Sequence, residues 1–419
     1  MSASFEKNLQ YYKFCAYGFL KDLRFYEPFL LLFFMEKGLG YLQIGSLYAV
    51  REITINLMEI PSGLLADVMG RRRAMLVSFA AYIASFLIFF FAKSYWVLLP
   101  AMLAYAVGDA FRTGTHKAMI FDYLKSRGWQ HLRTHYYGHT RSWSQRGAAL
   151  SALIAAALVF YQGSYAPVFL FTIIPYALDF LLILSYPAWL DGPRHGSKRS
   201  IRSEFGEVWA SLLQTIKHPP ALKAIANQAL YTGYYKAVKD YLQPLLKVMA
   251  LSIPVMTALE GDKRTAIITG VMYSLLFLLT STASSLSGRF SERYKDLAKP
   301  LNKTLFTGLL LGLASGIAYA LTIPVLAVLL YVGIYVIENL RKPMGIAYIS
   351  ERMRQESMAS SLSVESQAET LFAAGLALLL GFFSKLYGPG MGLLLISGLC
   401  VLLGVFLRLP AVKTTEPGA

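Results

Sequence analysis

Twelve apolar runs, each long enough to cross a bilayer, constrain this 419-residue chain more than any other feature of its sequence. An α-helix of about 20 apolar residues spans the hydrocarbon core and satisfies its own backbone hydrogen bonds there. Only 15% of the residues are charged, against roughly 25% in an ordinary soluble domain. The runs lie at residues 14–36, 42–66, 74–92, 96–122, 137–160, 165–190, 219–250, 266–288, 302–322, 324–349, 359–384 and 390–410. We therefore predict an all-α membrane protein with twelve transmembrane helices.

The basic residues indicate which ends of the runs face the cytoplasm. The formal net charge is +16, and its Lys and Arg residues gather in alternate connections, as Arg71, Arg72 and Arg73 do after the second run. This bias follows the positive-inside rule if the N-terminus is inside. We expect a protein integral to the cytoplasmic (inner or plasma) membrane with both termini cytoplasmic. The excess of basic over acidic residues then reflects membrane topology, and no nucleic-acid partner is expected.

The longest polar connection separates six runs from six. It begins at Asp191 and ends near His218. The predicted organisation is an N-terminal six-helix bundle over residues 1–190, a cytoplasmic linker over 191–218 and a C-terminal six-helix bundle over 219–419.

An internal repeat supports this division. An acid, an arginine three residues later and a second acid ten residues after the arginine occur in both the fourth and the tenth run. The members are Asp109, Arg112 and Asp122 in the fourth run and Glu338, Arg341 and Glu351 in the tenth. The ends of the second and eighth runs also match, as Ser62-Gly63-x-x-x-Asp67 and Ser287-Gly288-x-x-x-Glu292. The two bundles are therefore expected to be pseudo-symmetric.

The connection after the second run carries a family resemblance. Its sequence, Gly63-Leu-Leu-Ala-Asp67-Val-Met-Gly70-Arg71-Arg72-Arg73, resembles the G-x-L-A-D-x-x-G-R-[KR]-[KR] motif of the major facilitator superfamily, which stands at the same place in that family. The resemblance implies the fold of this superfamily and a transporter, with no enzyme activity, that works as a monomer.

The same resemblance implies a cytoplasmic gate. Its residues are Gly63, Asp67, Gly70, Arg71 and, within reach of Arg71, Asp122. Gly63 would let its helix end approach a neighbour closely. Asp67 would accept hydrogen bonds from a helix N-terminus or pair with a guanidinium. Arg72 and Arg73 are interpreted as topology anchors.

Ionisable side chains inside the predicted spans indicate the transport site, because a charge at membrane depth is costly unless it pairs or faces a cavity. An arginine there favours an anion, which it binds through paired N–H donors. The candidate substrate-binding residues are Arg24, Arg112, Arg341, Tyr231, Tyr235 and Lys239. The candidates for reversible protonation are Asp22, Glu27, Asp109 and Glu338. A substrate that captures an arginine would leave the neighbouring acid free to take up a proton.

Structural alternatives stay open for these residues. The acid–arginine pairs of the fourth and tenth runs could be ion pairs that hold the bundle together, and the tyrosines of the seventh run could be packing residues. Glu59 could belong to the gate. His116 is interpreted as a structural hydrogen-bonding residue in preference to a proton relay.

The predicted function is secondary active transport, coupled to protons, of a small polar solute with an anionic group by alternating access. The expected partners are that solute, protons and the lipid bilayer. The first alternative is proton-driven drug efflux, which is disfavoured because the fifth run lacks the G-x-x-x-G-P pattern usual in drug antiporters of the superfamily. The second alternative, from another class, is a membrane enzyme or sensor built on the same fold.

No catalytic residues and no cofactor are expected, because the sequence contains no G-x-x-x-x-G-K-[ST] motif and no nucleophile–histidine arrangement. His131, His135 and His139 stand at four-residue steps, and such a ladder could bind a metal if it were helical throughout. Since no acidic residue lies close by, no metal site is expected.

Overall fold

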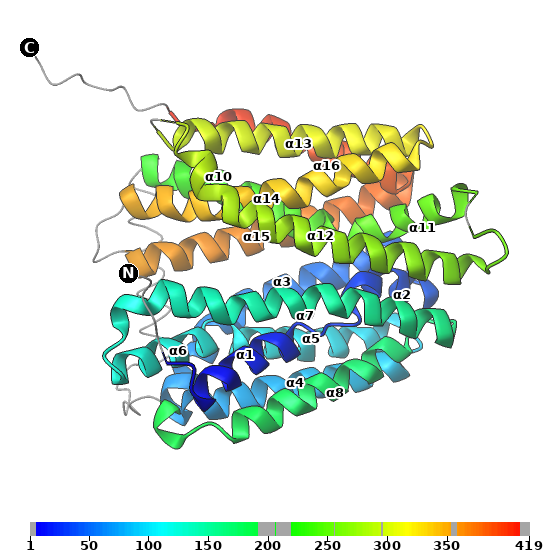
Figure 1. Cartoon of the computed structure of the whole chain (residues 1–419). Coiled ribbons are helices and arrows are strands. Elements are labelled where there is room, and N and C mark those ends of the chain that lie inside the picture. Colours follow the sequence, from blue (N-terminus) through cyan, green and yellow to red (C-terminus); the bar gives the residue numbers. More distant parts are fainter. Residues whose placement is uncertain are drawn as a thin grey trace, which may run out of the picture. The chain divides into compact units, whose positions relative to one another are not determined.

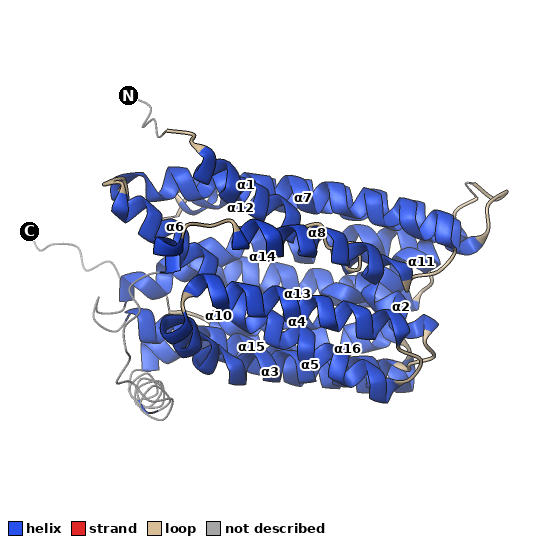
Figure 2. Cartoon of the chain, turned by 90° about the horizontal axis from the view of Figure 1, so that it is seen from below, coloured by secondary structure: helices blue, strands red, loops and turns tan. Residues whose placement is uncertain are grey.

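The computed structural model describes residues 6–191, 206, 219–254, 256–294, 296–352 and 358–410, and at residues 131, 133–135, 350–352 and 358–363 it describes the backbone only. Throughout these described residues the regular elements are α-helices and short 3-10 helices (Figures 1 and 2). The predicted all-α membrane class is confirmed.

The described part of the first half of the chain contains eight α-helices. They are α1 (Leu9–Lys21), α2 (Leu30–Glu36), α3 (Tyr41–Met69), α4 (Arg71–Phe91), α5 (Tyr95–Arg112), α6 (Thr115–Ser126), α7 (Arg133–Gln162) and α8 (Pro167–Leu184), with 3-10 helices η1 (Glu27–Phe29), η2 (Gln130–Leu132) and η3 (Ala188–Asp191). The described part of the second half contains α10 (Pro219–Val238), η4 (Lys239–Tyr241), α11 (Leu242–Ser252), α12 (Gly261–Ser291), α13 (Ala298–Ala320), α14 (Pro324–Arg352), α15 (Met358–Tyr387) and α16 (Pro389–Phe406).

Eight helices in the described residues are long and apolar enough to cross a membrane. They contain the segments Arg71–Phe91, Tyr136–Gln162, Pro167–Leu184, Gly261–Ser291, Ala298–Ala320, Pro324–Ile349, Val364–Tyr387 and Pro389–Phe406. Each of these corresponds to one of the twelve predicted runs. The other four runs, at 14–36, 42–66, 96–122 and 219–250, stay predicted spans.

Those four runs contain helix breaks or charged residues that set them apart from the other eight. Three of them are interrupted, because α1 is followed by η1 and α2, α5 by α6, and α10 by η4 and α11. Gly114, between α5 and α6, has φ of +81°, a conformation that favours glycine over residues with a side chain. The fourth run forms α3, which carries the charged residues Arg51, Glu52, Glu59 and Asp67. Interrupted and charged segments are tolerated in lipid where protein or a cavity surrounds them.

The chain divides into two compact units. The first comprises Met1–Phe205 with Leu246–Leu278, and the second comprises Gly206–Leu245 with Leu279–Ala419. The segment Leu246–Leu278 of α11 and α12 thus belongs to the first unit. The predicted linker, residues 191–218, lies outside the described residues apart from Asp191 and Gly206. The predicted domain bounds therefore stay a prediction.

Four helix–helix contacts of the first unit have counterparts in the second, as an internal duplication predicts. In the first unit α4 packs on α5 and α8, and α1 packs on α7 and α8. In the second unit α13 packs on α14 and α16, and α10 packs on α15 and α16. The matched serines occupy equivalent places as well: Ser62 Oγ donates to the Ala110 carbonyl (3.1 Å) and Ser287 Oγ donates to the Leu340 carbonyl (2.8 Å).

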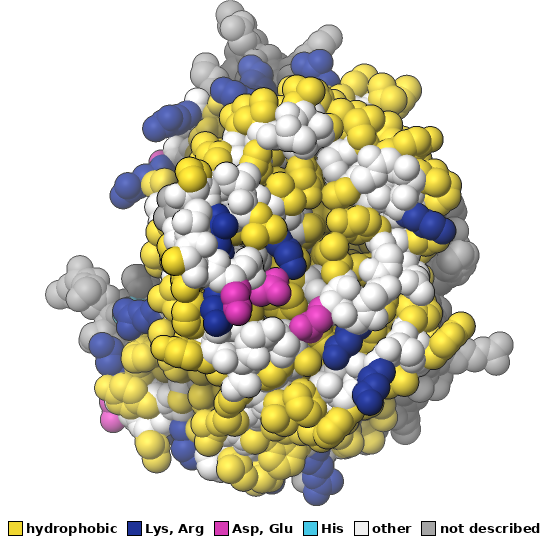
Figure 3. All heavy atoms as spheres, turned by 90° about the vertical axis from the view of Figure 1, so that its right-hand side faces the viewer, with side chains coloured by type: hydrophobic (Ala, Val, Ile, Leu, Met, Phe, Trp, Pro, Cys, Tyr) yellow, Lys and Arg dark blue, Asp and Glu magenta, His cyan; other side chains and the backbone are white. Residues whose placement is uncertain are grey.

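Large apolar side chains remain exposed along the helices. Leu181 on α8, Leu278 on α12 and Phe406 on α16 are examples. In water so much apolar surface along the helices would favour aggregation, whereas in a bilayer it faces the acyl chains. Figure 3 looks along the helices, from the right-hand side of Figure 1, onto their ends, where Lys, Arg, Asp and Glu side chains lie among hydrophobic ones.

Candidate functional site

Four charged side chains meet where the first predicted span is interrupted. Helix α1 ends at Lys21, and the backbone is not helical again until η1 begins at Glu27. Asp22 accepts from Lys21 Nζ at 2.7 Å and pairs with Arg24 at 3.1 Å, and Arg24 also lies 3.7 Å from Glu27. These side chains are between 15% and 25% exposed, so the cluster is enclosed without being sealed.

A second ion pair lies near the end of α5. Arg112 Nη2 donates to Asp109 Oδ1 at 2.6 Å. The Tyr82 hydroxyl, from α4, donates to the same oxygen at 2.6 Å and accepts from Arg112 Nε at 3.0 Å. Both charged side chains keep about a fifth of their surface exposed, 18% for Arg112 and 22% for Asp109. Tyr82 therefore holds the pair in place while part of both charged side chains stays exposed.

The two clusters act on each other electrostatically within the first unit. The charge of Arg24 acts on Asp109, and the charges of Lys21 and Asp22 act on Arg112. Together they contain three cations, Lys21, Arg24 and Arg112, and three carboxylates, Asp22, Glu27 and Asp109. The formal charges balance. An anion that entered this group would leave it one negative charge in excess unless a proton came with it.

Asp179 is a fourth carboxyl beside this group, and the sequence analysis missed it. It is the only acidic or basic residue of α8, and it is fully buried. Neither of its carboxylate oxygens has a hydrogen-bond partner among the described residues. The charges that act on it belong to Lys21, Asp22 and Arg112. The available signal was a lone acid four residues after Pro175 in an otherwise apolar run, a pattern that predicts an intramembrane functional residue.

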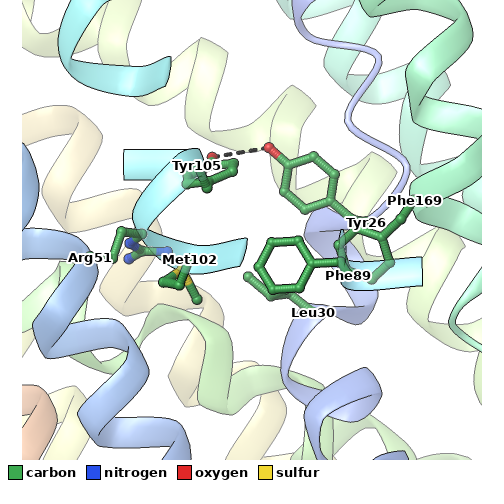
Figure 4. Close-up of a pocket in the computed structure, with 7 residues that line it drawn as sticks. All are labelled: Tyr26, Leu30, Arg51, Phe89, Met102, Tyr105 and Phe169. Atoms are coloured by element: carbon green, nitrogen blue, oxygen red, sulfur yellow. Dashed lines mark hydrogen bonds between the residues drawn. The ribbon is translucent and has the colours of Figure 1, made fainter. Parts of the chain in front are cut away.

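Aromatic side chains enclose the same region. The Tyr82 ring lies 5.2 Å from the rings of both Tyr105 and Tyr176, and the Tyr26 and Tyr105 hydroxyls are 3.0 Å apart. Figure 4 shows Tyr26 and Tyr105 at a small cavity with Arg51 at its edge. The volume of that cavity is about 10 Å³, room for about one water molecule. It is too small to hold a solute.

A buried ion pair on α3 also borders this cavity. Arg51 Nη2 lies 3.0 Å from Glu52 Oε1, and both side chains are buried. The guanidinium also sits 5.0 Å above the Tyr48 ring. The sequence analysis did not select Arg51, although an arginine inside a predicted span is itself a signal.

In the second unit Arg341 occupies a different environment from that of Arg112. It has no exposed surface. Its guanidinium donates to the carbonyls of Leu301 and Asn227, each at 2.7 Å, and to the Asn227 side-chain oxygen, and it lies 5.6 Å from the centre of the Tyr231 ring. All of these partners belong to α10 and α13. These groups occupy both terminal nitrogens of the guanidinium, while its Nε has no hydrogen-bond partner among the described residues. The expected anion-binding role of Arg341 stays a prediction.

Two tyrosines expected in the binding site, Tyr231 and Tyr235, differ in burial, as Arg341 and Arg112 do. Tyr231 is fully buried and its hydroxyl donates to the Ile334 carbonyl at 3.2 Å, as the packing alternative predicts. Tyr235 is half-buried and meets the Tyr335 ring edge-on at 5.1 Å. Lys239 is also half-buried, 3.7 Å from Asp240. Tyr235 and Lys239 thus keep exposed surface, whereas Tyr231 has none.

The carboxylates of the second unit form their own group. The Thr232 hydroxyl donates to Glu338 at 3.0 Å, and Glu338 has no ion pair with Arg341 at the distances the structure gives for described residues. Glu369 lies 3.6 Å from Lys236 and 3.7 Å from Lys342. The acid–arginine repeat is thus kept in sequence but not in geometry.

A search of family models matches residues 22–368 of this chain to the Major Facilitator Superfamily. The chain belongs to this superfamily. An uncharacterized transporter of the superfamily type from Bacillus subtilis (strain 168), YxaM, is 30% identical over 95 residues, which is 23% of this chain and 24% of that protein. The match thus spans about a quarter of that relative.

Several solved transporter structures share the fold of this chain. A mutant of the nucleoside transporter NupG matches with a TM-score of 0.75 and 13% identity over 95% of this chain and 98% of that one. A mutant of the peptide transporter POT in complex with sulfate matches with a TM-score of 0.73 and 12% identity over 97% and 94%. A bacterial homologue of the human lysosomal transporter Spinster matches with a TM-score of 0.69 and 16% identity, over 97% of each chain. These likenesses show the fold, and membership of the superfamily makes the chain an integral membrane transporter.

The superfamily motif contains one of the expected gate contacts. Arg71, at the start of α4, forms an ion pair with Asp122 of α6. Within its own unit Asp67 is exposed and has neither a helix N-terminus nor a guanidinium as partner among the described residues. Within the first unit no described atom lies within 4 Å of the place where a Cβ on Gly63 would stand, so the close helix approach expected there stays a prediction.

Gly70 and Arg72 connect this transporter's motif to the end of α8. Gly70 has φ of +96°, and a Cβ there would stand 3.0 Å from Asp191 Cγ. Asp191 accepts a 2.9 Å hydrogen bond from the Arg72 backbone N–H in the first turn of α4, where a carboxylate is favourable. The Arg72 side chain donates to the Tyr186 carbonyl at 3.0 Å. Arg72 thus has a structural contact in addition to its expected role as an anchor.

His116 makes the structural contacts that were expected of it. Its ring stacks on Tyr17 at 3.5 Å between centroids, and its Nε2 lies 3.1 Å from the Tyr186 hydroxyl. The side chains of His131 and His135 lie outside the described residues. Over the residues that were searched, no group of three or more His, Cys, Asp or Glu side chains could hold a metal ion.

Proposed function

We propose that this protein is a proton-coupled secondary transporter that moves a small polar solute bearing an anionic group by alternating access. The observation that carries the proposal is the balanced group of three cations and three carboxylates in the first unit. Such a group is costly inside a membrane protein. Its retention is explained if the cations bind an anion.

Arg112 is the proposed anchor of the anionic group. Asp109 now occupies one side of its guanidinium at 2.6 Å, and a carboxylate or phosphate of the solute would bind there through paired N–H donors. Tyr82 contacts both residues, so it would keep Arg112 oriented during the exchange. Arg24, which pairs with two carboxylates, is the proposed second cation.

Proton coupling follows from the charge balance. When the anion displaces Asp109, this carboxylate loses its cation, and an enclosed carboxylate without a partner is stabilised by taking up a proton. Asp22, Glu27 and, in the second unit, Glu338 remain proposed carriers. Asp179 is added to them, because it is buried and its oxygens have no hydrogen-bond partner among the described residues. Solute and proton would then load together.

In the second unit, Tyr235 and Lys239 are the proposed solute contacts, because both are half-buried. Arg341 and Tyr231 are left out of the proposed site, since both side chains are fully buried and donate to backbone carbonyls. Alternating access is proposed to involve rocking of the two units, with Gly63, Asp67, Gly70, Arg71 and Asp122 as the cytoplasmic gate.

The solved neighbours support a polar solute by analogy of fold, since two of them are described as nucleoside and peptide transporters.

The aromatic side chains around Arg112 favour the second candidate, proton-driven efflux of amphipathic compounds. Tyr82, Tyr105 and Tyr176 could stack on a ring system. The membrane orientation proposed for either function has both termini in the cytoplasm of an inner or plasma membrane.

A binding screen followed by transport separates these functions. The purified protein is heated at pH 5.5 and at pH 7.5 with organic acids, phosphorylated metabolites, nucleosides, peptides and cationic drugs, since a ligand of the folded state raises its apparent stability. Hits are then tested in proteoliposomes with a pH gradient. The proposal expects an anionic solute that accumulates with the proton gradient. Stabilisation by cationic drugs alone, with transport opposite to the proton, would replace it by the efflux function.

A further inference from the structure

A large cavity in the second unit shares no lining residue with the proposed transport site. Its volume is about 920 Å³, and it is bounded by the start of α10, the first turns of α13 and the end of α16, three helices that pack together (Figure 1). Its lining includes Lys223, Lys299, Lys303 and Arg408 together with Phe306 and Val405.

The charge of this cavity is of one sign. Four of its ten lining residues are cations and none is acidic. Lys223, Lys299, Lys303 and Arg408 have no ion pair within the part of the chain that the structure describes. This differs from the transport site, where each cation has a carboxylate within 4 Å. Cations held together without counter-charge repel one another, and an anion between them removes that repulsion.

Hydrogen bonds fix the backbone that follows α16 and lines the cavity. Asn302 donates to the Leu409 carbonyl at 2.8 Å and accepts from the Leu409 N–H at 2.9 Å. Asn227 donates to the Leu407 carbonyl at 2.9 Å. The backbone on both sides of Arg408 is therefore fixed, and the residue stays at the rim of the cavity when no ligand is bound.

The position of the cavity selects the ligand. α13 and α16 are candidate membrane spans, and the cations stand at their ends, where lipid headgroups lie. Leu402, Val405 and Phe406 are exposed on the last turns of α16, so an apolar surface leads from the cavity along the span. Cations beside exposed apolar residues fit a molecule that has both a phosphate and acyl chains.

We propose that this cavity is a binding site for the headgroup of an anionic phospholipid. Lys303 and Arg408 contact its phosphate, Lys223 and Lys299 add positive charge at the rim, and Val405 and Phe406 contact the first methylenes of an acyl chain. The proposal does not depend on which solute is transported.

Thermal unfolding of the full-length protein in a neutral detergent tests it. The added probes are phosphatidylglycerol, cardiolipin, zwitterionic phosphatidylcholine, and sn-glycerol-3-phosphate or inorganic phosphate at equal phosphate concentration. The test variant is Lys303→Gln with Arg408→Gln. The matched control is Arg73→Gln with Lys125→Gln, which removes two exposed cations from the predicted cytoplasmic side of the first unit. A charge-conserving variant, Lys303→Arg with Arg408→Lys, checks that substitution at these positions leaves the protein folded.

We expect phosphatidylglycerol or cardiolipin to raise the unfolding temperature, with little effect of phosphatidylcholine or of the soluble phosphates. The Gln variant should need roughly 30-fold more anionic lipid for the same shift, since each basic residue beside anionic headgroups contributes about a fivefold to sixfold factor in affinity. The control and the charge-conserving variant should respond like the wild type. An equal loss in the control would mean general surface attraction, and a shift with soluble phosphate alone would mean a free anion site; either result overturns the lipid site.

Discussion

Arg112 and Arg341 are equivalent in the sequence repeat, yet the structure predicts opposite results for their replacement by alanine. Arg341→Ala should destabilise the protein. Its side chain is fully buried and makes three hydrogen bonds, two to backbone carbonyls and one to the Asn227 side chain. Side-chain hydrogen bonds in membrane proteins contribute about 0.6 kcal/mol on average and up to about 1.7 kcal/mol each. Three of them predict a loss of roughly 2 to 5 kcal/mol.

Arg112→Ala should leave stability nearly unchanged and abolish solute binding. Arg112 is partly exposed, and its contacts are one ion pair with Asp109 and one hydrogen bond to Tyr82. A partly exposed ion pair contributes about 0 to 1 kcal/mol. Removing the guanidinium takes away the proposed anion anchor, however, so affinity should fall by two orders of magnitude or more for a charge-assisted bidentate contact of about 3 kcal/mol.

Both variants are compared with the wild type by reversible unfolding in mixed SDS micelles and by solute binding in the folded state. Arg341→Met, which keeps the apolar stem, should recover part of the stability but none of the hydrogen bonds. The reasoning would be refuted if Arg341→Ala unfolded like the wild type and lost solute binding. It would equally fail if Arg112→Ala kept its affinity.

Four further changes have defined outcomes. Asp109→Asn should weaken uptake driven by a pH gradient more than solute exchange at equal pH, and an unchanged gradient dependence in proteoliposomes would assign coupling elsewhere. Asp179→Asn should keep solute affinity but reduce the proton-to-solute ratio measured with a pH-sensitive dye, whereas an unaltered ratio would make this buried acid structural. Gly70→Ala should lower unfolding stability by about 1 to 3 kcal/mol, because φ is positive and a Cβ would meet a carboxylate; equal stability would contradict this. Asp122→Asn removes the partner of Arg71 and should slow turnover while affinity is retained, and normal turnover would argue against a gate.

The order of the helices follows from sequence because lipid makes local composition decisive. A run of about 20 apolar residues has few alternatives to a membrane-spanning helix, and the positions of the runs agree with the observed elements from α3 to α16. The interruptions of the first, fourth and seventh runs were harder to predict from the sequence. They occur at short polar stretches such as Asp22–Tyr26 and Thr113–Gly114, where composition alone does not separate a broken helix from a continuous one.

The site was predicted in part, for a related reason. The spacing of Asp109 and Arg112 on one helix face predicts their contact, since residues three apart in a helix are neighbours, and the structure contains that pair at 2.6 Å. Tyr82 could not be assigned to this pair from the sequence, because it comes from another helix. The same three-residue spacing wrongly predicts a contact between Glu338 and Arg341. There the partners are Thr232 on α10 and carbonyls of α10 and α13.

By itself, the sequence determined the membrane class, the helical spans, the repeat and the superfamily motif, because each depends on residues close together along the chain. Only the tertiary structure decided which buried charges face protein groups and which face a partly open space. It placed Arg341 among carbonyls, Arg112 beside an exchangeable carboxylate, Asp179 without a hydrogen-bond partner among the described residues, and four lysine and arginine side chains around one cavity. A charged residue has the same identity in all of these environments, and the free energy of its charge is set by neighbours from other helices.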